Sequence, residues 1–428
     1  MADTMRRKVV ITGLGLATPL GLDVEESWRK ALAGINGIGR IDLPNAEKSP
    51  VQAAGQISAP DWDRICREFP AEARSEGERR TLFALWAAKK ALADAKWRED
   101  GRDCSRCGAV LASGLGINRL EDIHSWLDDK KFDSDWFASE YGQVHRESII
   151  RNNSSRPAAL IAEKFGLDGI NATVTTACAS STQAIGTAFR AIARGEADLI
   201  VTGGADSMLN PVGLIFFVLL GSAAVSRMEP ALLCRPFDRK RSGLVMGEGA
   251  GMVVLEDEEH ARRRGAKIYA EVAGYGSSMD AYRLTAPQPE GKGAAESMRR
   301  ALADAGMAPD GIDYINAHGT STKLNDIAET LAVREVFGEY ADGLAISSSK
   351  SLIGHLLAAS GGPEFVFTTL SVQRDAIHPT LNLTNPDPKC DLDYVPNVKR
   401  EKIVRAALSN SFGFGGQNAT IAVKKYTG

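Results

Sequence analysis

Short apolar runs typical of buried strands alternate with helical patterns along most of the chain, and this alternation limits the possible folds more than any other feature. Strand-like runs occupy 107–114 and 197–206 and end in glycine or polar residues. Amphipathic periodicity covers 79–95, 156–165 and 180–193. Strands that alternate with helices in this way pair in parallel, and the helices cover the faces of the sheet. The sequence therefore predicts an α/β fold.

The order of these elements is partly repeated later in the chain. IYAEVAGYG at 268–276 resembles the opening strand KVVIT and the glycine-rich stretch after it, which we predict to be a turn. LAISSSKSLIGHLLAASGG at 344–362 repeats the order of strand, turn and helix found around residue 178. A repeated order indicates two related halves. We expect the boundary within the charged stretch EDEEHARRRGAK, which gives units of residues 1–265 and 266–428.

Composition excludes several classes of function. The net charge of −3 provides no overall basic field for nucleic acid or an anionic membrane surface. The most apolar run, 211–225, is shorter than the roughly 20 residues that span a bilayer, so we expect a buried helix or an interface and no membrane insertion. The six cysteines are scattered, and no signal-peptide pattern precedes KVVIT, so we expect a reducing, cytoplasmic location.

Cys178 lies between a β-branched run and a helical pattern, in VTTACASSTQAIGTAF at 174–189. At the start of a helix its sulfur would meet unpaired N–H groups and the positive end of the helix dipole, which favour a thiolate. Its small neighbours leave room for a substrate. A free cysteine is also among the most commonly buried residue types, so local sequence leaves both a nucleophile and a packing residue open.

Two histidines occupy comparable strand-end contexts. His318 follows the apolar run IDYIN in NAHGTST, and His355 follows SSSKSLIG, which contains Lys350. Polar loops at strand ends are where α/β proteins place functional groups. These histidines lack metal-ligand spacing, and Cys104-x-x-Cys107 is a single pair, so we expect neither a metal site nor a redox site.

Near the C-terminus, SNSFGFGGQNAT at 409–420 combines phenylalanines with glycines that can adopt positive φ. The stretch is compatible with a flexible gate over a channel, with a backbone N–H donor, or with an ordinary turn between strands. Local sequence does not decide among these three roles.

Taken together and in order, TACASS, NAHGTST, SSSKSLIGH and SFGFGG resemble the β-ketoacyl-acyl carrier protein synthases, and most closely the synthase II type. The resemblance extends through RPFDRKRSGLVMGEGAGMVVLE at 235–256 and NLTNPDPKCDLDYVPN at 382–397 and covers nearly the whole chain. It implies a thiolase-like fold of two βαβαβαββ halves in a five-layer αβαβα arrangement. It also implies a homodimer, although a heterodimer is possible.

The resemblance assigns roles to residues throughout the chain. Cys178 is the acylated nucleophile, His318 and His355 face the malonyl thioester, and Lys350 supports them. The N–H groups of Cys178 and Phe414 form the oxyanion hole. Further matches are the supporting residues Glu364, Asp326 and Glu329, and the substrate-binding residues Thr285, Thr320, Thr322, Phe412 and Phe414.

The implied reaction is a decarboxylative Claisen condensation in fatty acid chain elongation, catalysed by a 3-oxoacyl-[acyl-carrier-protein] synthase, which is an acyltransferase. A thiolate takes up the acyl chain, neutral histidines stabilise the enolate formed from malonyl-acyl carrier protein, and the carbanion attacks the acyl-cysteine. Phosphopantetheine arrives on the carrier protein, so the family requires no cofactor of its own. An acidic carrier protein needs a local basic patch, and Arg79, Arg80, Lys130 and Lys131 are its candidates, unless they are ordinary solvated side chains.

Two segments depart from the synthase II pattern. LIFFVLLGSAAVSRM at 214–228 is bulkier and longer than its counterpart, and 141–160 is more polar. Acyl chain length is therefore not implied. These departures leave open a ketosynthase of a type II polyketide, polyene or similar specialised pathway. A non-catalytic chain-length subunit and a thiolase also stay open, and Cys178 together with both histidines argues against that subunit.

Overall fold

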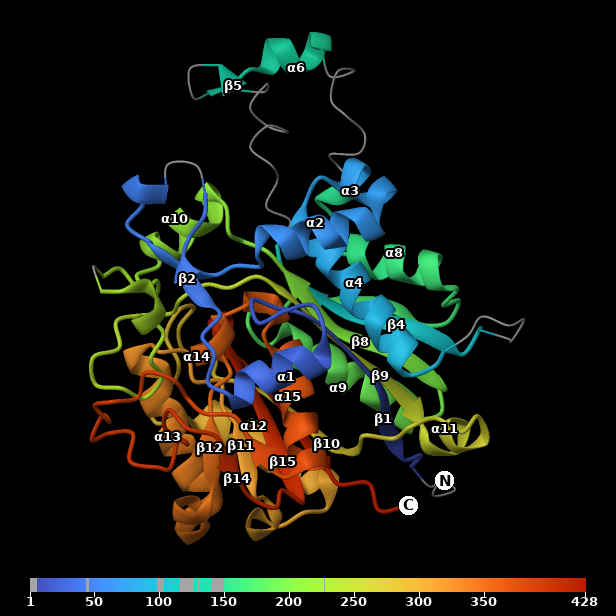
Figure 1. Ribbon diagram of the computed structural model, residues 1–428, viewed down its shortest axis with the longest axis vertical. Coiled ribbons are helices and arrows are strands. Elements are labelled where there is room, and N and C mark those ends of the chain that lie inside the picture. Colours follow the sequence, from blue (N-terminus) through green and yellow to red (C-terminus); the bar gives the residue numbers. More distant parts are fainter. Residues whose placement is uncertain are drawn as a thin grey trace.

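The computed structural model describes residues 6–43, 46–97, 104–115, 127–128, 131–140, 150–226 and 228–428. Ten strands form its largest sheet (Figure 1). In spatial order they are β12 (Ala345–Ser347), β11 (Tyr314–Asn316), β15 (Ala406–Gly413), β16 (Gln417–Lys424), β10 (Ala270–Met279), β1 (Val9–Ala17), β9 (Gly249–Asp257), β8 (Leu199–Asp206), β4 (Cys107–Ser113) and β7 (Asn171–Val174).

The two halves of the sheet have the same internal order. Outward from the centre, β1, β9, β8, β4 and β7 correspond to β10, β16, β15, β11 and β12. In each set the first three strands pair antiparallel and the last two extend the sheet in parallel. The predicted relation between the two halves is therefore confirmed. The boundary at residue 265 stays a prediction.

The glycines after KVVIT do not form the predicted turn. Strand β1 continues through them to Ala17, with a register shift between Ile11 and Gly13. A Cβ on Gly13 or Gly15 would lie only 2.1 or 2.0 Å from a backbone oxygen of helix α4 (Arg79–Asp94). These glycines therefore let a helix pack directly on the strand. The sequence predicted a turn here because the lack of a side chain favours a tight turn and close packing of a helix equally.

Five layers follow from where the helices lie. Helices α4 and α8 (Arg156–Phe165) cover one outer face, and α12 (Lys292–Ala305) and α13 (Lys323–Phe337) cover the other. Helices α9 (Ser180–Ala193) and α15 (Gly361–Arg374) contact strands of both halves and lie between them in Figure 1. The αβαβα arrangement is confirmed, and the bounds predicted for α8 and α9 agree with the structure.

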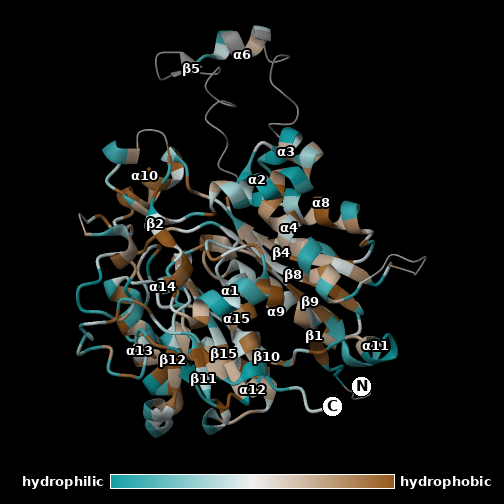
Figure 2. Cartoon of the chain, viewed as in Figure 1, coloured by the Kyte–Doolittle hydropathy of each residue, from teal (hydrophilic) through white to brown (hydrophobic). Residues whose placement is uncertain are grey.

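Hydrophobic cores fill the spaces between these layers. The central core packs α9 and α15 side chains, among them Phe189 and Phe365, against β1 and its neighbours. Two outer cores lie beneath α4 and beneath α12 and α13. In Figure 2, hydrophobic residues colour much of α9, whereas the peripheral α11 (Glu258–Arg263) is hydrophilic. Burial of the helix faces therefore fixes the two halves against each other.

Smaller elements complete the described part of the chain. They are α1 (Val24–Leu32), β2 (Ile38–Arg40), β3 (Ala53–Gly55), α2 (Ala59–Glu68), α3 (Pro70–Glu76), β5 (Leu127–Asp128), β6 (Lys131–Phe132), α6 (Ser134–Glu140), α10 (Pro211–Leu219), α14 (Lys350–Ile353), β13 (Ala376–Ile377) and β14 (Arg400–Glu401). Helix α10, in the apolar run, buries Leu214 and Phe217 but leaves Leu219 79% exposed. Within the described ranges, no helix has the length and apolar character needed to cross a membrane.

Candidate active site

A cavity of about 470 Å³ opens where polar turns from the two halves meet. Cys178, from the N-terminal half, lines it together with His318 and His355 from the C-terminal half. The turn at Phe412–Phe414 forms another part of the wall. The structure thus brings together residues that the sequence placed in four separate motifs.

Cys178 lies between β7 and α9, two residues before the helix begins. Ala177 has φ of +49°, so the backbone turns sharply there and presents the sulfur to the cavity. The side chain is only 6% exposed. Burial raises the pKa of the Cys178 thiol to about 11, while a hydrogen bond from the Phe414 backbone and the charge of Lys350 lower it. Burial therefore outweighs these two contacts, and the free enzyme carries a thiol at neutral pH.

The glycine-rich turn lies directly against the cysteine turn. A Cβ on Gly413 would approach the backbone nitrogen of Cys178 to 3.1 Å. The backbone N–H of Phe414 donates to the Cys178 sulfur. Gly415 and Gly416 have φ of +80° and +79°, which allows the chain to turn back into β16 after this donor. Two backbone N–H groups, those of Cys178 and Phe414, therefore lie beside the sulfur.

His318 is held from both sides at the end of β11. Glu329 accepts hydrogen bonds from the backbone N–H groups of His318 and Gly319, each at 2.8 Å. Lys350 Nζ lies 3.2 Å from His318 Nδ1. Since an ammonium group only donates, Nδ1 accepts and the ring proton is on Nε2. The free edge of this imidazole is thus a hydrogen-bond donor.

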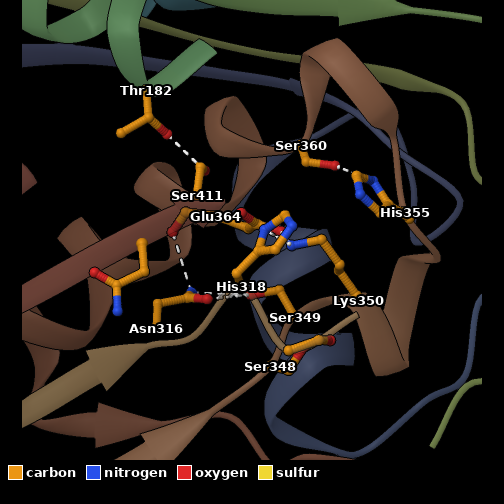
Figure 3. A network of polar contacts seen from close by, with 12 residues as sticks. Thr182, Asn316, His318, Ser348, Ser349, Lys350, His355, Ser360, Glu364 and Ser411 are labelled. Atoms are coloured by element: carbon orange, nitrogen blue, oxygen red, sulfur yellow. Dashed lines mark hydrogen bonds and ion pairs between the residues drawn. The ribbon is translucent and has the colours of Figure 1, made fainter. Parts of the chain in front are cut away.

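His355 also carries its ring proton on Nε2, but different groups hold this tautomer in place. Its Nδ1 accepts from the backbone N–H of Leu357 at 3.0 Å, and Ser360 Oγ lies 2.9 Å from the same nitrogen (Figure 3). The proton is therefore on Nε2. Sequence reasoning missed Ser360, because its serine lies among small residues in LLAASGG with no distinguishing pattern.

The three side chains form one compact group. The sulfur of Cys178 and a ring nitrogen from each histidine all lie within 4.8 Å of one another. The two rings are perpendicular, with centroids 5.4 Å apart. Burial lowers the pKa of both histidines well below the usual value, and Lys350 lowers it further. Both rings are neutral at pH 7, so the site presents two uncharged donors next to a sulfur.

Lys350 and Glu364 form a buried ion pair behind the histidines. Their side chains are 0% and 1% exposed, and Nζ lies 2.5 Å from Oε1. Burial raises the pKa of Glu364 to about 7, against the effect of the Lys350 charge. Figure 3 shows Lys350 reaching past His318 toward this carboxylate. Lys350 thus joins the carboxylate to His318 and does not line the cavity.

Asp326 supports the site from the outer side. It accepts from the Phe237 backbone N–H at 2.9 Å and lies 3.3 Å from the buried Arg241 guanidinium. Arg241 also pairs with Asp387 at 2.7 Å. Burial raises the pKa of Asp326, and Arg241 lowers it. Sequence reasoning gave Arg241 no role, although it lies in the quoted stretch RPFDRKRSG.

The predicted substrate-binding residues line the cavity. Thr285, Thr320, Thr322 and Phe412 all contribute to its wall. The hydroxyl oxygens of Thr320 and Thr322 are 2.8 Å apart. Phe414 stacks on Phe217 of α10, with ring centroids 6.4 Å apart. The divergent segment around 214–228 therefore contacts the turn whose backbone N–H donates to the Cys178 sulfur.

The candidate basic patch on α4 does not fit the structure. Arg80 is 4% exposed and donates to the carbonyl groups of Gly114 and Arg151. Arg79 makes a bidentate pair with the fully buried Glu248, at 2.9 and 2.6 Å. Arg80 is therefore not available as a surface patch, and Arg79, although its side chain is 27% exposed, is held by an interior carboxylate. Lys130 lies outside the described residues, and the structure describes only the backbone of Lys131.

Comparison with known families assigns the chain. Residues 6–261 match the family described as Beta-ketoacyl synthase, N-terminal domain, and residues 269–384 match its C-terminal domain. The chain belongs to the β-ketoacyl synthase family. Its thiolase-like fold is the one expected from that resemblance.

Relatives of this β-ketoacyl synthase match it over the full length. The chain is 40% identical to "3-oxoacyl-[acyl-carrier-protein] synthase 2" of Synechocystis sp., over 100% of both chains. The protein of the same name from Staphylococcus aureus strain N315 is also 40% identical, over 99% of both. A solved type II PKS ketosynthase, in complex with its acyl-carrier protein and bound to a hexaketide, superposes with a TM-score of 0.89. It is 33% identical and is matched over 100% of its length by 99% of this chain.

Proposed function

We propose that this β-ketoacyl synthase condenses an acyl chain held on Cys178 with malonyl-acyl carrier protein, giving 3-oxoacyl-acyl carrier protein and CO₂ in fatty acid elongation. The observation that carries the proposal is the group of one thiol and two neutral Nε2–H donors within 4.8 Å in a single cavity. The names of the two 40% identical relatives support the same activity.

Acyl transfer comes first. The sulfur of Cys178 attacks the acyl thioester, and the bond between the acyl carbon and the carrier sulfur breaks, so that the thiol proton ends on the released carrier thiol. The N–H groups of Cys178 and Phe414 lie beside the sulfur and can stabilise the oxyanion of the intermediate. The free-state hydrogen bond from Phe414 to the sulfur is then exchanged for one to that oxygen.

Decarboxylation uses the two histidines. Malonyl thioester loses CO₂, and negative charge develops on its thioester oxygen as the enolate forms. Neutral His318 and His355 each present an Nε2–H that can donate to this oxygen. Because the lowered pKa values keep the rings uncharged, they stabilise the enolate without protonating its carbon. The carbanion then attacks the acyl-Cys178 carbonyl, and the carbon–sulfur bond breaks to release the elongated chain.

An apolar cluster of side chains lies next to the turn that contacts the nucleophile. Phe414 packs against a cluster that includes Met208, Phe217, Leu244 and Leu357. We assign this cluster to the acyl chain and the Thr285, Thr320 and Thr322 side to phosphopantetheine. Movement of Phe414 away from Phe217 would open the path between them.

The proposed chemistry needs no resident cofactor. Phosphopantetheine enters with the carrier protein, and charge is stabilised by N–H donors throughout. Cys178, His318 and His355 have the atom types that bind zinc, but Lys350 lies against His318 and its positive charge disfavours a cation there. None of the six cysteines forms a disulfide, and we propose a reducing, cytoplasmic location on that basis.

For the carrier protein we propose a patch at the mouth of the cavity in place of α4. The lining residues Lys323 and Ser242 mark this mouth, and Arg239, Lys240 and Arg283 lie close to lining residues in sequence. All four cationic side chains are exposed, and none forms an ion pair within the described ranges. The solved ketosynthase with its bound carrier protein supports the interaction.

Charge reversal of Lys323 and Arg283 tests this surface. The two changes should raise KM for acyl-carrier protein with little change in kcat. A KM equal to that of the wild type would contradict the proposed surface.

For assembly we propose a homodimer paired through β7. One edge of β7 pairs with β4, and its other edge pairs with no strand in the described part of the chain. The carbonyl of Ile170 accepts from Ala109, so the N–H of Thr173 points to the open edge. Thr173→Pro should therefore leave the β4 pairing intact and convert a dimer to a monomer in light scattering, with Thr173→Val as the control. A dimer that survives the proline rules out this interface.

The competing functions are less well supported. Identity to the synthase 2 relatives is 40%, against 33% to the polyketide ketosynthase, so fatty acid elongation is favoured over a specialised pathway. A non-catalytic subunit has no need for the buried thiol and paired donors seen here. The deciding experiment supplies acyl-carrier proteins of increasing chain length with malonyl-carrier protein and measures product by intact-protein mass spectrometry. Absence of any condensation product would overturn the proposed function.

A further inference from the structure

One acidic residue outside the cavity is attached to the loop that carries His355. Asp206 ends strand β8, is 2% exposed, and belongs to the other half of the chain. Its Oδ2 accepts from the backbone N–H of Ala358 at 3.0 Å, and its Oδ1 accepts from Ser207 at 2.9 Å. Gly114 leaves space for the carboxylate, because a Cβ there would lie 2.4 Å from Oδ2.

The same residue, Ala358, is held from a second direction through its carbonyl group. Ser181, in the first turn of the helix that follows Cys178, donates its hydroxyl to the carbonyl of Ala358 at 2.5 Å. Both polar backbone groups of Ala358 are therefore bonded to the N-terminal half. We call Asp206 and Ser181, with the peptide groups of Ala358 that they hold, the Ala358 clamp.

The residue before the clamp is in an unfavourable conformation. Leu357 has φ of +52°, in the left-handed region that a leucine adopts only when its surroundings impose it. Its N–H is the group that donates to Nδ1 of His355. Leu357 therefore joins the N–H that bonds Nδ1 of His355 to the clamped residue through a strained backbone conformation.

We propose that Asp206 and Ser181 are positioning residues that, by fixing Ala358, direct the Leu357 N–H at Nδ1 of His355 and so keep its Nε2–H toward the malonyl thioester. The inference rests on the proposed function for what the Nε2–H does, but the tautomer itself is measurable without turnover. The clamp also links the nucleophile and the donor physically, because Ser181 lies in the first turn of α9, three residues after Cys178.

The test compares Asp206→Ala and Ser181→Ala with Thr202→Val. Thr202 lies on the same strand, is fully buried, and has a hydroxyl without a hydrogen-bond partner in the described structure, so its removal leaves the clamp intact. Nitrogen-15 NMR of histidine-labelled protein, assigned with His355→Asn, should show an unprotonated Nδ1 in the wild type and in Thr202→Val. In the two alanine variants we expect a mixture of both tautomers.

Kinetic measurements should also distinguish the two alanine variants from the wild type and from Thr202→Val. Acylation of Cys178, followed by mass spectrometry, should stay near wild type in both variants, while decarboxylation of malonyl-carrier protein falls about 10- to 100-fold as expected for a misaligned donor. Equal losses in both steps, or a decarboxylation loss with an unchanged tautomer, would overturn the proposal. If Asp206→Ala does not fold, Ser181→Ala and Asp206→Asn, which keeps one acceptor, provide the same readouts. A wild type that forms no condensation product would count against the proposed function alone, since the tautomer would still report on the clamp.

Discussion

The two halves of the molecule make the same strand-to-helix connection in different ways. In the N-terminal half, β7 reaches α9 through residues 175–179, and this short turn presents Cys178. In the C-terminal half, the corresponding connection from β12 to α15 runs through residues 348–360 and includes α14. The longer connection carries both Lys350 and His355.

The difference in length separates two kinds of chemistry. A short turn at the start of a helix holds one sulfur beside backbone N–H groups, which suits a nucleophile and its oxyanion. The long connection has room for an ion pair and for an N–H that fixes a ring nitrogen. A fold built from two related halves thus places the thiol of Cys178 on one connection and the imidazole of His355 on the other, while His318 lies on the neighbouring loop after β11.

Replacing the Cys178 side chain should distinguish the roles of the two connections most clearly. Cys178→Gln should lower condensation by roughly 10⁴-fold or more, because no acyl-enzyme forms, yet it should retain decarboxylation, since both donors are unchanged. Release of CO₂ from malonyl-carrier protein is the measurement, and Cys66→Ser, at a half-buried thiol elsewhere, is the control. Loss of decarboxylation as well would mean that the two connections do not act separately.

Removing a donor should give the reverse pattern. His318→Ala deletes one Nε2–H, and loss of one such donor lowers the rate of decarboxylation by about 10²- to 10³-fold. Acylation of Cys178 should survive, because its oxyanion donors come from the backbone. Intact-protein mass spectrometry measures the acyl-enzyme. If no acyl-enzyme appears, His318 also takes part in the first step.

The buried ion pair should make the long connection sensitive to charge. Lys350→Met leaves Glu364 buried without its partner, which should lower the free energy of unfolding by about 3 kcal/mol or more. The double variant with Glu364→Gln should recover much of this loss, because no isolated charge remains. Denaturant unfolding measures both, and an equal loss in the double variant would show that packing of the lysine, and not its charge, is what matters.

The burial of Cys178 on the short connection should be visible in the pH dependence of its alkylation. With the pKa of Cys178 raised to about 11, the thiolate fraction grows with pH, and alkylation by iodoacetamide should speed up about tenfold per pH unit between roughly pH 7 and 10. Peptide mapping distinguishes Cys178 from the other five thiols. A rate that is already level near pH 7 would show that the helix N-terminus outweighs burial after all.

Much of the fold was accessible from the sequence because its signals are local. The bounds of α8 and α9 and the relation between the halves follow from periodicity and repeated order. The glycines of β1 were misread because their use depends on α4, which is distant in sequence. Arg79 and Arg80 were misplaced for a similar reason, since their partners, such as Glu248, come from other elements.

Four short motifs were enough to name Cys178, His318, His355 and Phe414 as residues of one site. Their chemical state follows from how the chain packs around them. Burial sets the thiol of Cys178 and the neutral rings, and contacts from Lys350 and Leu357 set both tautomers. These properties depend on solvent exclusion and on partners from other parts of the chain, and no local pattern encodes either.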